Sequence, residues 1–249
     1  MSDTVQTKEL TLILPDRKIY GKAFLPPQSG DKLSAVILSH GYNSCHGDLA
    51  DIAHALVETG AFAYCFDFCG GSTRSKSSGS TLDMSIASEI SDLKAVTEYI
   101  KTLEYVDKDS IYLYGESQGG FVSALAADEG IKGMYLLYPA FCIPDHWKDT
   151  AEKGIDGSME FMGMPLSNRF CEGLPDYDVF ERISGYGGRV RIYQGDADTL
   201  VPLHYAQKAA DSFKNAALTV FEGEAHGFSP AARQRLTALI CSDFAAARK

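Results

Sequence analysis

The segment at residues 111–121 constrains the fold of this chain more than any other. It reads Ile-Tyr-Leu-Tyr-Gly-Glu-Ser-Gln-Gly-Gly-Phe, an apolar run of strand formers that meets Gly-x-Ser-x-Gly and passes at once into helix-compatible sequence. Such a strand–turn–helix junction puts the serine, Ser117, on a tight outward bend, and the glycines on either side leave room where strand and helix approach each other. The pattern therefore predicts a nucleophile elbow rather than an ordinary turn with a surface serine.

Strand-like and helix-like segments alternate along most of the sequence, which predicts an α/β protein with a mostly parallel sheet and flanking helices. The N-terminal part differs, because Pro-Asp-Arg at 15–17 joins two runs into antiparallel edge strands, followed by a loop at 26–31. Strands are expected at 10–14, 19–24, 35–39, 61–66, 111–114, 133–138, 190–194 and 218–221. Helices are expected at 48–59, 85–103, 119–127, 203–213 and 230–247.

The alternation stops between residues 139 and 185, where no clean strand pattern is visible. A segment of this length inside a compact domain is usually functional, so we expect a small cap subdomain over the active site. The cap is inserted into a core formed by 1–138 and 186–249; a peripheral decoration is the alternative. Its apolar side chains could line a substrate site or pack the cap: Trp147, Phe161, Met162 and Tyr177, our candidates for substrate binding, with Met164 and Phe170.

Composition limits the partners of the protein. With 249 residues, 45% of them hydrophobic, the chain can form one large core, or one core with a small subdomain. A formal net charge of −10 argues against a nucleic-acid partner, because a phosphate backbone requires clustered Lys and Arg. The apolar runs are strand-length, too short to span a membrane, and the N-terminal residues lack a basic start followed by an apolar run. We therefore expect a cytoplasmic protein.

The six cysteines do not form a metal-binding pattern. Cys65 and Cys69 are four apart, and no second pair completes a zinc site. We expect reduced cysteines that mainly fill the core, and a site that uses neither a metal nor a cofactor.

The elbow serine needs a base to take its proton and an acid to orient that base, in the chain order Ser, Asp or Glu, His. The base is His226, which lies after the last expected strand and before the last expected helix. The acid comes from the loop after the strand at 190–194, where Asp196 and Asp198 both qualify. The other aspartate of this pair would brace the loop by accepting backbone N–H bonds.

The chemistry also needs donors for an oxyanion. One is the backbone N–H of Gln118, next to the nucleophile at the start of a helix. The second is expected from the loop after the third strand, where Gly41 allows the backbone to turn an N–H inward, and we assign it to Tyr42. His40, at the end of that strand, is expected to stabilise the loop rather than act as the base.

Five motifs together resemble those of the bacterial α/β-hydrolases, and among them the cinnamoyl/feruloyl esterases of gut and rumen bacteria. They are His-Gly-Tyr at 40–42, Phe-Asp-Phe-Cys-Gly-Gly-Ser at 66–72, Gly-Glu-Ser-Gln-Gly-Gly at 115–120, Gly-Asp-Ala-Asp-Thr-Leu-Val-Pro at 195–202 and Ala-His-Gly-Phe at 225–228. The resemblance implies the α/β-hydrolase fold, a compact insertion that matches 139–185, Asp198 as the acid, and oxyanion amides at Tyr42 and Gln118. This sequence differs from that group at Glu116, where the group often has His. It also differs at 69–71, where it has Cys-Gly-Gly and the group usually has Arg-Gly-His or Asn-Gly-His.

The leading hypothesis is a carboxylic-ester hydrolase with Ser117, His226 and Asp198 as its triad. Its partner would be a small to medium ester, with hydroxycinnamoyl esters as one class implied by the resemblance. A monoacylglycerol-type lipase and a serine aminopeptidase are the alternatives among enzymes, and a non-catalytic binding protein on a hydrolase scaffold is the alternative outside them. The sequence leaves the oligomeric state open, with a homodimer as one option.

Overall fold

The strand that leads into the Gly-x-Ser-x-Gly motif lies in the interior of an eight-stranded sheet, as its apolar run predicts. The computed structural model describes residues 5–27 and 32–248, so residues 28–31 of the expected loop lie outside the described residues. The strands of the sheet are β1 (Gln6–Ile13), β2 (Lys18–Leu25), β3 (Leu33–Ser39), β4 (Phe62–Phe66), β5 (Val106–Glu116), β6 (Gly133–Leu137), β9 (Arg189–Gly195) and β10 (Ala216–Phe221).

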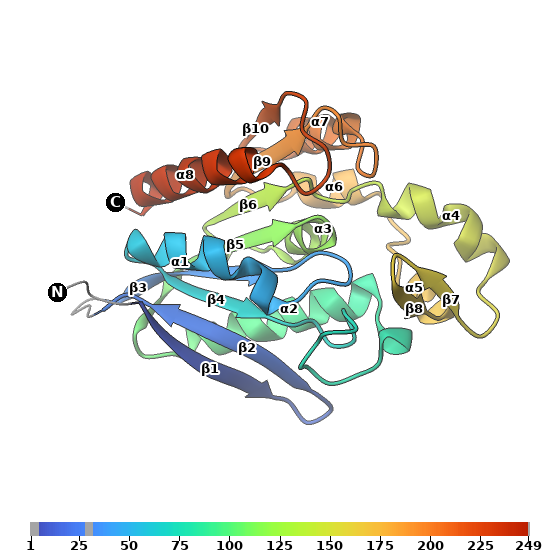
Figure 1. The fold of residues 1–249 in the computed structure, drawn as a ribbon, viewed down its shortest axis with the longest axis horizontal. Coiled ribbons are helices and arrows are strands. Elements are labelled where there is room, and N and C mark those ends of the chain that lie inside the picture. The colour runs from blue at the N-terminus through green and yellow to red at the C-terminus, as the bar shows by residue number, and fades with distance from the viewer. Residues whose placement is uncertain (1–4, 28–31, 249) are drawn as a thin grey trace.

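The order of the strands is β1-β2-β4-β3-β5-β6-β9-β10. The edge hairpin β1–β2 and the pair β2–β4 are antiparallel, and the remaining pairs are parallel. This confirms the predicted fold class, a mostly parallel sheet with antiparallel N-terminal edge strands. The carboxyl ends of the parallel strands meet at one edge of the sheet, on the right in Figure 1, where ligands bind in open α/β sheets.

Helices cover both faces of the sheet (Figure 1). Alternate residues of β3 show why: Ile37 belongs to one buried cluster and Leu38 to the other. The first cluster lies under α2 (Ile86–Lys101), α3 (Gln118–Ala126) and α7 (Leu203–Ser212), and the second under α1 (Ala50–Glu58) and α8 (Pro230–Ala247). A fully buried Leu or Ile stabilises the fold by about 1.5–3 kcal/mol, so both faces must be covered.

The start of α2 follows from its sequence. Ser85 precedes the helix, and its Oγ accepts a hydrogen bond from the N–H of Ser88 at 3.1 Å, while its own N–H donates to Ser88 Oγ at 2.9 Å. This reciprocal capping satisfies two backbone N–H donors at the helix terminus. No helix in the described part of the chain combines the length and the apolar character that crossing a bilayer requires.

The segment after β6 contains α4 (Ile143–Lys153), β7 (Met159–Phe161), β8 (Met164–Leu166), α5 (Asn168–Glu172) and α6 (Val179–Ser184). The expectation that it holds no strand was wrong, because β7 and β8 pair as a short antiparallel hairpin. Met162 and Gly163 both have positive φ angles, 46° and 77°, which is the geometry of a tight hairpin turn. In Figure 1, α4, α5 and this hairpin lie beyond the carboxyl edge of the sheet.

Candidate active site

The backbone turns sharply at Ser117, between β5 and α3. Its φ of 52° and ψ of −119° are unusual for a residue with a side chain. The turn needs glycines around it, since a Cβ at Gly115 would lie 2.4 Å from the carbonyl oxygen of Gly119, and a Cβ at Gly119 would lie 2.3 Å from that of His40. The motif therefore folds as the elbow that the sequence predicts, with Ser117 at the carboxyl edge of the sheet.

The structure brings Ser117 and His226 together. His226 comes from the loop between β10 and α8, and its Nε2 accepts a hydrogen bond from Ser117 Oγ at 3.0 Å. On the other side of the ring, Nδ1–H donates to Asp198 Oδ2 at 2.8 Å. A serine, a histidine and an aspartate linked in this order have the geometry that a base needs to take the serine proton and to hold it.

The two aspartates of the loop after β9 have different partners. Asp198 is buried and bonds to His226, and its Oδ1 accepts the backbone N–H groups of Leu200 at 2.9 Å and Val201 at 2.8 Å. Burial opposes its ionisation, but the hydrogen bonds from His226 and Val201 hold the pKa of Asp198 below its ordinary value. Asp196 instead accepts the backbone N–H of Gly223 at 2.6 Å.

Gln194 contributes to the site, and sequence reasoning missed it. It lies near the end of β9 and is fully buried, and its Nε2–H donates to Asp198 Oδ2 at 3.0 Å and to the carbonyl of Val201 at 3.0 Å. The carboxylate is therefore fixed on both oxygens. Only the position at the carboxyl end of a strand could have indicated this role.

The loop after β3 lies against the elbow. A Cβ at Gly41 would be only 3.2 Å from Ser117 Cβ, so the backbone at Gly41 passes next to the nucleophile. His40 is buried beneath this loop: its Nδ1–H donates to Gly41 O at 2.8 Å, and its Nε2 accepts the N–H of Phe68 at 3.2 Å. Burial lowers the pKa of His40, so it braces the loop as a neutral ring.

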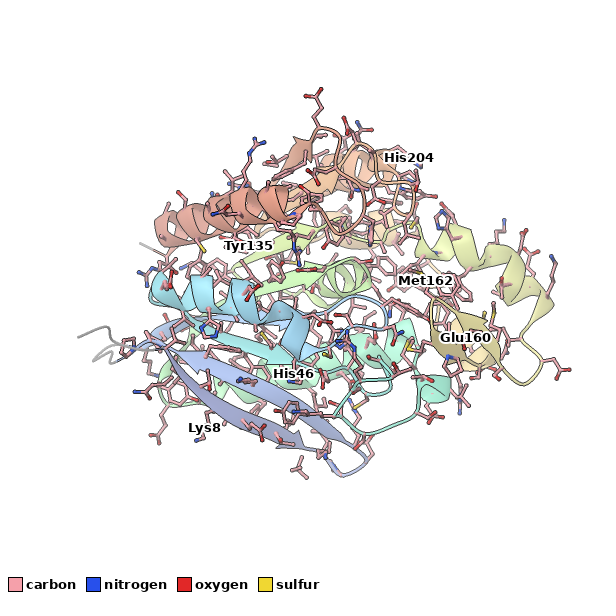
Figure 2. The ribbon with its side chains drawn as sticks, in the orientation of Figure 1. Lys8, His46, Tyr135, Glu160, Met162 and His204 are labelled. Atoms are coloured by element: carbon pink, nitrogen blue, oxygen red, sulfur yellow. The ribbon has the colours of Figure 1, made fainter. Side chains whose placement is uncertain are left out.

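A small apolar cavity of about 60 Å³ opens beside Ser117. Three of the candidate substrate-binding residues, Trp147, Phe161 and Met162, line it, and Figure 2 labels Met162 on the side of the 139–185 segment that faces the sheet. Tyr177 is 45% exposed and is not among the lining residues. The other lining residues are Tyr42, Gln118, Ala140, Cys142, Ile143, His146, Phe170, Leu200 and Val201.

Three hydrogen bonds tie the turn of the β7–β8 hairpin to the loop after β3. The Tyr42 hydroxyl donates to the carbonyl of Phe161 at 3.0 Å. The side-chain amide of Asn43 donates to the carbonyls of Met162 at 3.3 Å and Gly163 at 3.2 Å. The hairpin is thus hydrogen-bonded directly to the loop that carries a predicted oxyanion donor.

A buried carboxyl group lies behind Gln118. Glu89, on α2, accepts a hydrogen bond from Gln118 Nε2 at 2.8 Å, and it is almost fully buried. Burial raises the pKa of Glu89 to about 8, despite this bond. No local sequence pattern indicates this contact, because Glu89 and Gln118 are 29 residues apart along the chain.

We expect Glu89 to make the stability of the protein fall as the pH rises. In the unfolded chain the carboxyl loses its proton near its ordinary pKa of 4.5, whereas in the folded protein it keeps the proton up to about pH 8. Between these values the folded state binds the additional proton, so the free energy of unfolding decreases with pH. One pKa unit corresponds to about 1.4 kcal/mol, so the total decrease is on the order of a few kcal/mol.

Glu89→Gln should remove this part of the decrease. Urea unfolding at about pH 5, 7 and 9 measures it. Glu98→Gln is the matched control, because Glu98 lies on the exposed side of the same helix and bonds Lys101. Equal pH slopes for wild type and Glu89→Gln would contradict the prediction.

Cys45, His46 and Asp67 form the one cluster whose side chains could offer ligand atoms to a metal ion, within 4.8 Å of one another, in the described ranges. The Asp67 carboxylate already accepts the N–H (2.7 Å) and Nδ1–H (2.8 Å) of His46 and the N–H of Lys76 (2.9 Å). These bonds satisfy both carboxylate oxygens and join the loops after β3 and β4. The cluster is therefore accounted for as a structural contact.

The family model described as serine aminopeptidase, S33, matches residues 30–171. Similar solved structures include Est1E from Butyrivibrio proteoclasticus with ferulic acid bound, 23% identical with a TM-score of 0.81 over 95% of this chain and 96% of that one. A monoacylglycerol lipase from Paleococcus ferrophilus is 17% identical, with a TM-score of 0.70 over 92% of this chain and 99% of that one.

A third similar structure is the α/β hydrolase GrgF from Penicillium sp. sh18, 16% identical with a TM-score of 0.75 over 96% of this chain and 98% of that one. No curated protein matches by sequence. At these identities the likeness to the solved structures is one of fold, and it extends over nearly the whole chain.

Proposed function

The chain belongs to the serine aminopeptidase family, S33, and we propose that within this family it is a serine carboxylesterase that uses Ser117, His226 and Asp198. Its fold is the α/β-hydrolase fold. The observation that carries the proposal is that the His226 ring is hydrogen-bonded to Ser117 on one side and to Asp198 on the other. An apolar cavity next to Ser117 gives the acyl group of an ester a place to bind.

In the first step, Ser117 Oγ attacks the ester carbonyl carbon while His226 Nε2 takes the hydroxyl proton. Asp198 stabilises the imidazolium that results. The tetrahedral intermediate collapses when its bond to the alcohol oxygen breaks, and His226 returns the proton to that oxygen. The acyl-enzyme then reacts with water, whose proton passes to His226 and on to Ser117 Oγ as the acid leaves.

The oxyanion of each tetrahedral intermediate would be held by the backbone N–H groups of Tyr42 and Gln118. The closeness of Gly41 to Ser117 supports the first donor, and the start of α3 immediately after Ser117 supports the second. Removing one such donor in a serine hydrolase costs about 10²–10³ in turnover, so this loop is a large part of the proposed mechanism.

The lining of the cavity favours an ester over an aminoacyl substrate. An aminopeptidase must bind a protonated amino group, which requires a nearby carboxylate. Among the described residues that line the cavity there is no aspartate or glutamate. Aromatic rings from Trp147, Phe161 and Phe170 suit a flat apolar acyl group instead, and a hydroxycinnamoyl group is one such class. Est1E, with ferulic acid bound, supports this finer proposal by its similar fold.

The test is a panel of substrates given to the purified protein: a short acetate ester, methyl ferulate, a monoacylglycerol and an aminoacyl amide. We expect turnover of the esters and no turnover of the amide. Turnover of the amide alone would favour the aminopeptidase alternative, and preference for the monoacylglycerol would favour the lipase. Rates equal to buffer on every substrate would support a binding protein and overturn the proposal.

We further propose that residues 139–185 act as a cap that selects the acyl group. The cap aromatics pack on one another: the ring centroid of Trp147 lies 5.0 Å from that of Phe161 and 4.5 Å from that of Phe170. Phe161→Ala should therefore change the ratio of methyl ferulate to acetate turnover by about tenfold, the scale on which apolar pocket contacts discriminate. Comparison of kcat/KM for the two esters measures this ratio.

Tyr177→Ala is the matched control, because Tyr177 is an aromatic residue of the same segment outside the cavity lining. For Tyr177→Ala, the ratio of kcat/KM on methyl ferulate to kcat/KM on the acetate ester should equal that of the wild type. If Phe161→Ala lowered kcat/KM for both esters by one common factor, the segment would be structural and the specificity proposal would fail. The cytoplasmic location and the homodimer stay predictions.

A further inference from the structure

A partly buried group of polar side chains surrounds Glu116, the residue before the elbow serine: two tyrosines in it are buried, whereas Glu116 and Arg233 are partly exposed. Its Oε1 accepts hydrogen bonds from the Tyr114 hydroxyl at 2.6 Å and from Arg233 Nη1 at 2.9 Å. Its Oε2 accepts the Tyr138 hydroxyl at 2.8 Å, and that same hydroxyl oxygen accepts a bond from Arg233 Nη1 at 3.0 Å. The group joins β5, the end of β6 and α8.

Tyr138 reaches from this group to the proposed base. Its φ is 34°, a strained value for a bulky residue, and its N–H is held by the carbonyl of Tyr193 at 2.7 Å. Its ring packs against the His226 ring, with centroids 4.5 Å apart and planes inclined by 55°. Phe228 packs on the same ring, at 5.3 Å. The strained backbone thus directs an aromatic ring onto the imidazole.

We propose that Tyr138, held by Glu116 and Arg233, is a positioning residue that orients the His226 ring and stabilises its protonated form during turnover. The inference rests on the proposed function, since it assigns this role around the same base. It adds a third contact to the two that Ser117 and Asp198 make with the imidazole.

Two physical effects give Tyr138 this role. The hydrogen bonds at the hydroxyl fix the plane of the Tyr138 ring, and that plane limits rotation of the imidazole, so that Nε2 keeps facing Ser117 Oγ. The ring also presents π-electron density to the imidazolium, and a cation within about 6 Å of a ring centroid is stabilised, most where water is excluded.

The charges around the site agree with this role. Burial and the Glu116 carboxylate raise the pKa of the Tyr138 phenol, so its hydroxyl keeps its proton and acts as a donor. Burial opposes the charge of Arg233, yet Glu116 raises the pKa of Arg233, so the two groups form a paired charge. The titratable groups that face His226 are Asp198 and Tyr138 directly, and Glu116 with Arg233 behind the Tyr138 ring.

Two variants test the proposal. Tyr138→Phe removes the hydroxyl that fixes the ring, and Tyr138→Leu removes the ring as well. We expect kcat to fall about threefold in Tyr138→Phe and about tenfold in Tyr138→Leu. KM should stay within a factor of about two, because only the protonated state of His226 loses stabilisation. The pH midpoint of kcat/KM should shift downward by roughly half a unit in Tyr138→Phe and by roughly one unit in Tyr138→Leu, since a destabilised imidazolium loses its proton more readily.

Tyr135→Phe is the matched control. Tyr135 lies on β6, three residues before Tyr138, and its hydroxyl donates to the carboxylate of Asp243 at 3.1 Å, away from the site. Figure 2 labels it on the part of the molecule remote from the cap. This variant loses a comparable hydrogen bond, so its kcat and pH midpoint should equal those of the wild type.

The pKa of His226 can also be measured without substrate, by proton NMR of the imidazole, with the His226→Gln spectrum identifying its signal among those of the six histidines. A lower pKa in both Tyr138 variants supports the inference even if no ester is turned over, a result that would contradict the proposed function alone. Wild-type values of kcat and of the His226 pKa in Tyr138→Phe overturn the inference, and this variant decides the matter if Tyr138→Leu does not fold.

Discussion

Ser117→Ala should lower ester turnover about a million-fold, the loss that follows removal of the nucleophile in serine hydrolases whose triad acts as a unit. The reason is structural: Ser117 Oγ is the atom bonded to His226 Nε2, and the elbow holds it at the carboxyl edge of the sheet. Single-turnover and steady-state rates on a chromogenic acetate ester measure the effect.

The fold should survive this change, because alanine fits the elbow and the glycines that shape the turn are untouched. Ser212→Ala is a suitable control, since its hydroxyl only donates to the Lys208 carbonyl within α7. That variant should retain wild-type rates. A Ser117→Ala protein with wild-type circular dichroism and near wild-type turnover would remove Ser117 from the mechanism.

Asp198→Asn should lower turnover by about 10⁴, whereas Asp196→Asn should leave it nearly unchanged. The first variant keeps the shape of the side chain but favours the wrong tautomer of His226, and the figure is that of the corresponding change in the protease that defines this triad. The second variant alters a bond to the Gly223 backbone, which is worth about 1 kcal/mol of stability.

The two variants control for each other. They remove one negative charge each, two residues apart on one loop, so the change in net charge is the same in both. The ratio of their kcat values is therefore the decisive measurement. A larger loss for Asp196→Asn, or similar losses for both, would contradict the assignment of Asp198 as the partner of His226.

The elements that the sequence predicts well are those fixed by local chemistry. The Gly-x-Ser-x-Gly turn is one, because only glycine fits at 115 and 119, where a side chain would collide with backbone carbonyls. The parallel strands are another, since residues such as Ile37 and Leu38 are buried on opposite faces and leave an unbroken apolar run. The expected bounds of β3 and β4 differ from the structure by one or two residues.

Contacts between distant segments could not be predicted in this way. The Tyr138–His226 contact joins the residue after β6 to the loop after β10, and the Glu89–Gln118 hydrogen bond joins α2 to the elbow. Nothing in the neighbouring sequence of Glu89 indicates that its carboxyl is buried. The β7–β8 hairpin was missed for another reason: its strands span three residues each, too few to show an alternating pattern.

The hydrogen bonds from Tyr42 and Asn43 to the turn of the β7–β8 hairpin have a consequence for how such enzymes diversify. An inserted segment that merely covered a site could be exchanged for another without regard to the core. Here side chains of the loop after β3 donate to backbone carbonyls of the hairpin, so a grafted segment with another turn geometry would leave Tyr42 and Asn43 without these acceptors. The β7–β8 hairpin and the loop after β3 are therefore expected to change together in evolution, and a chimaera should exchange both segments at once.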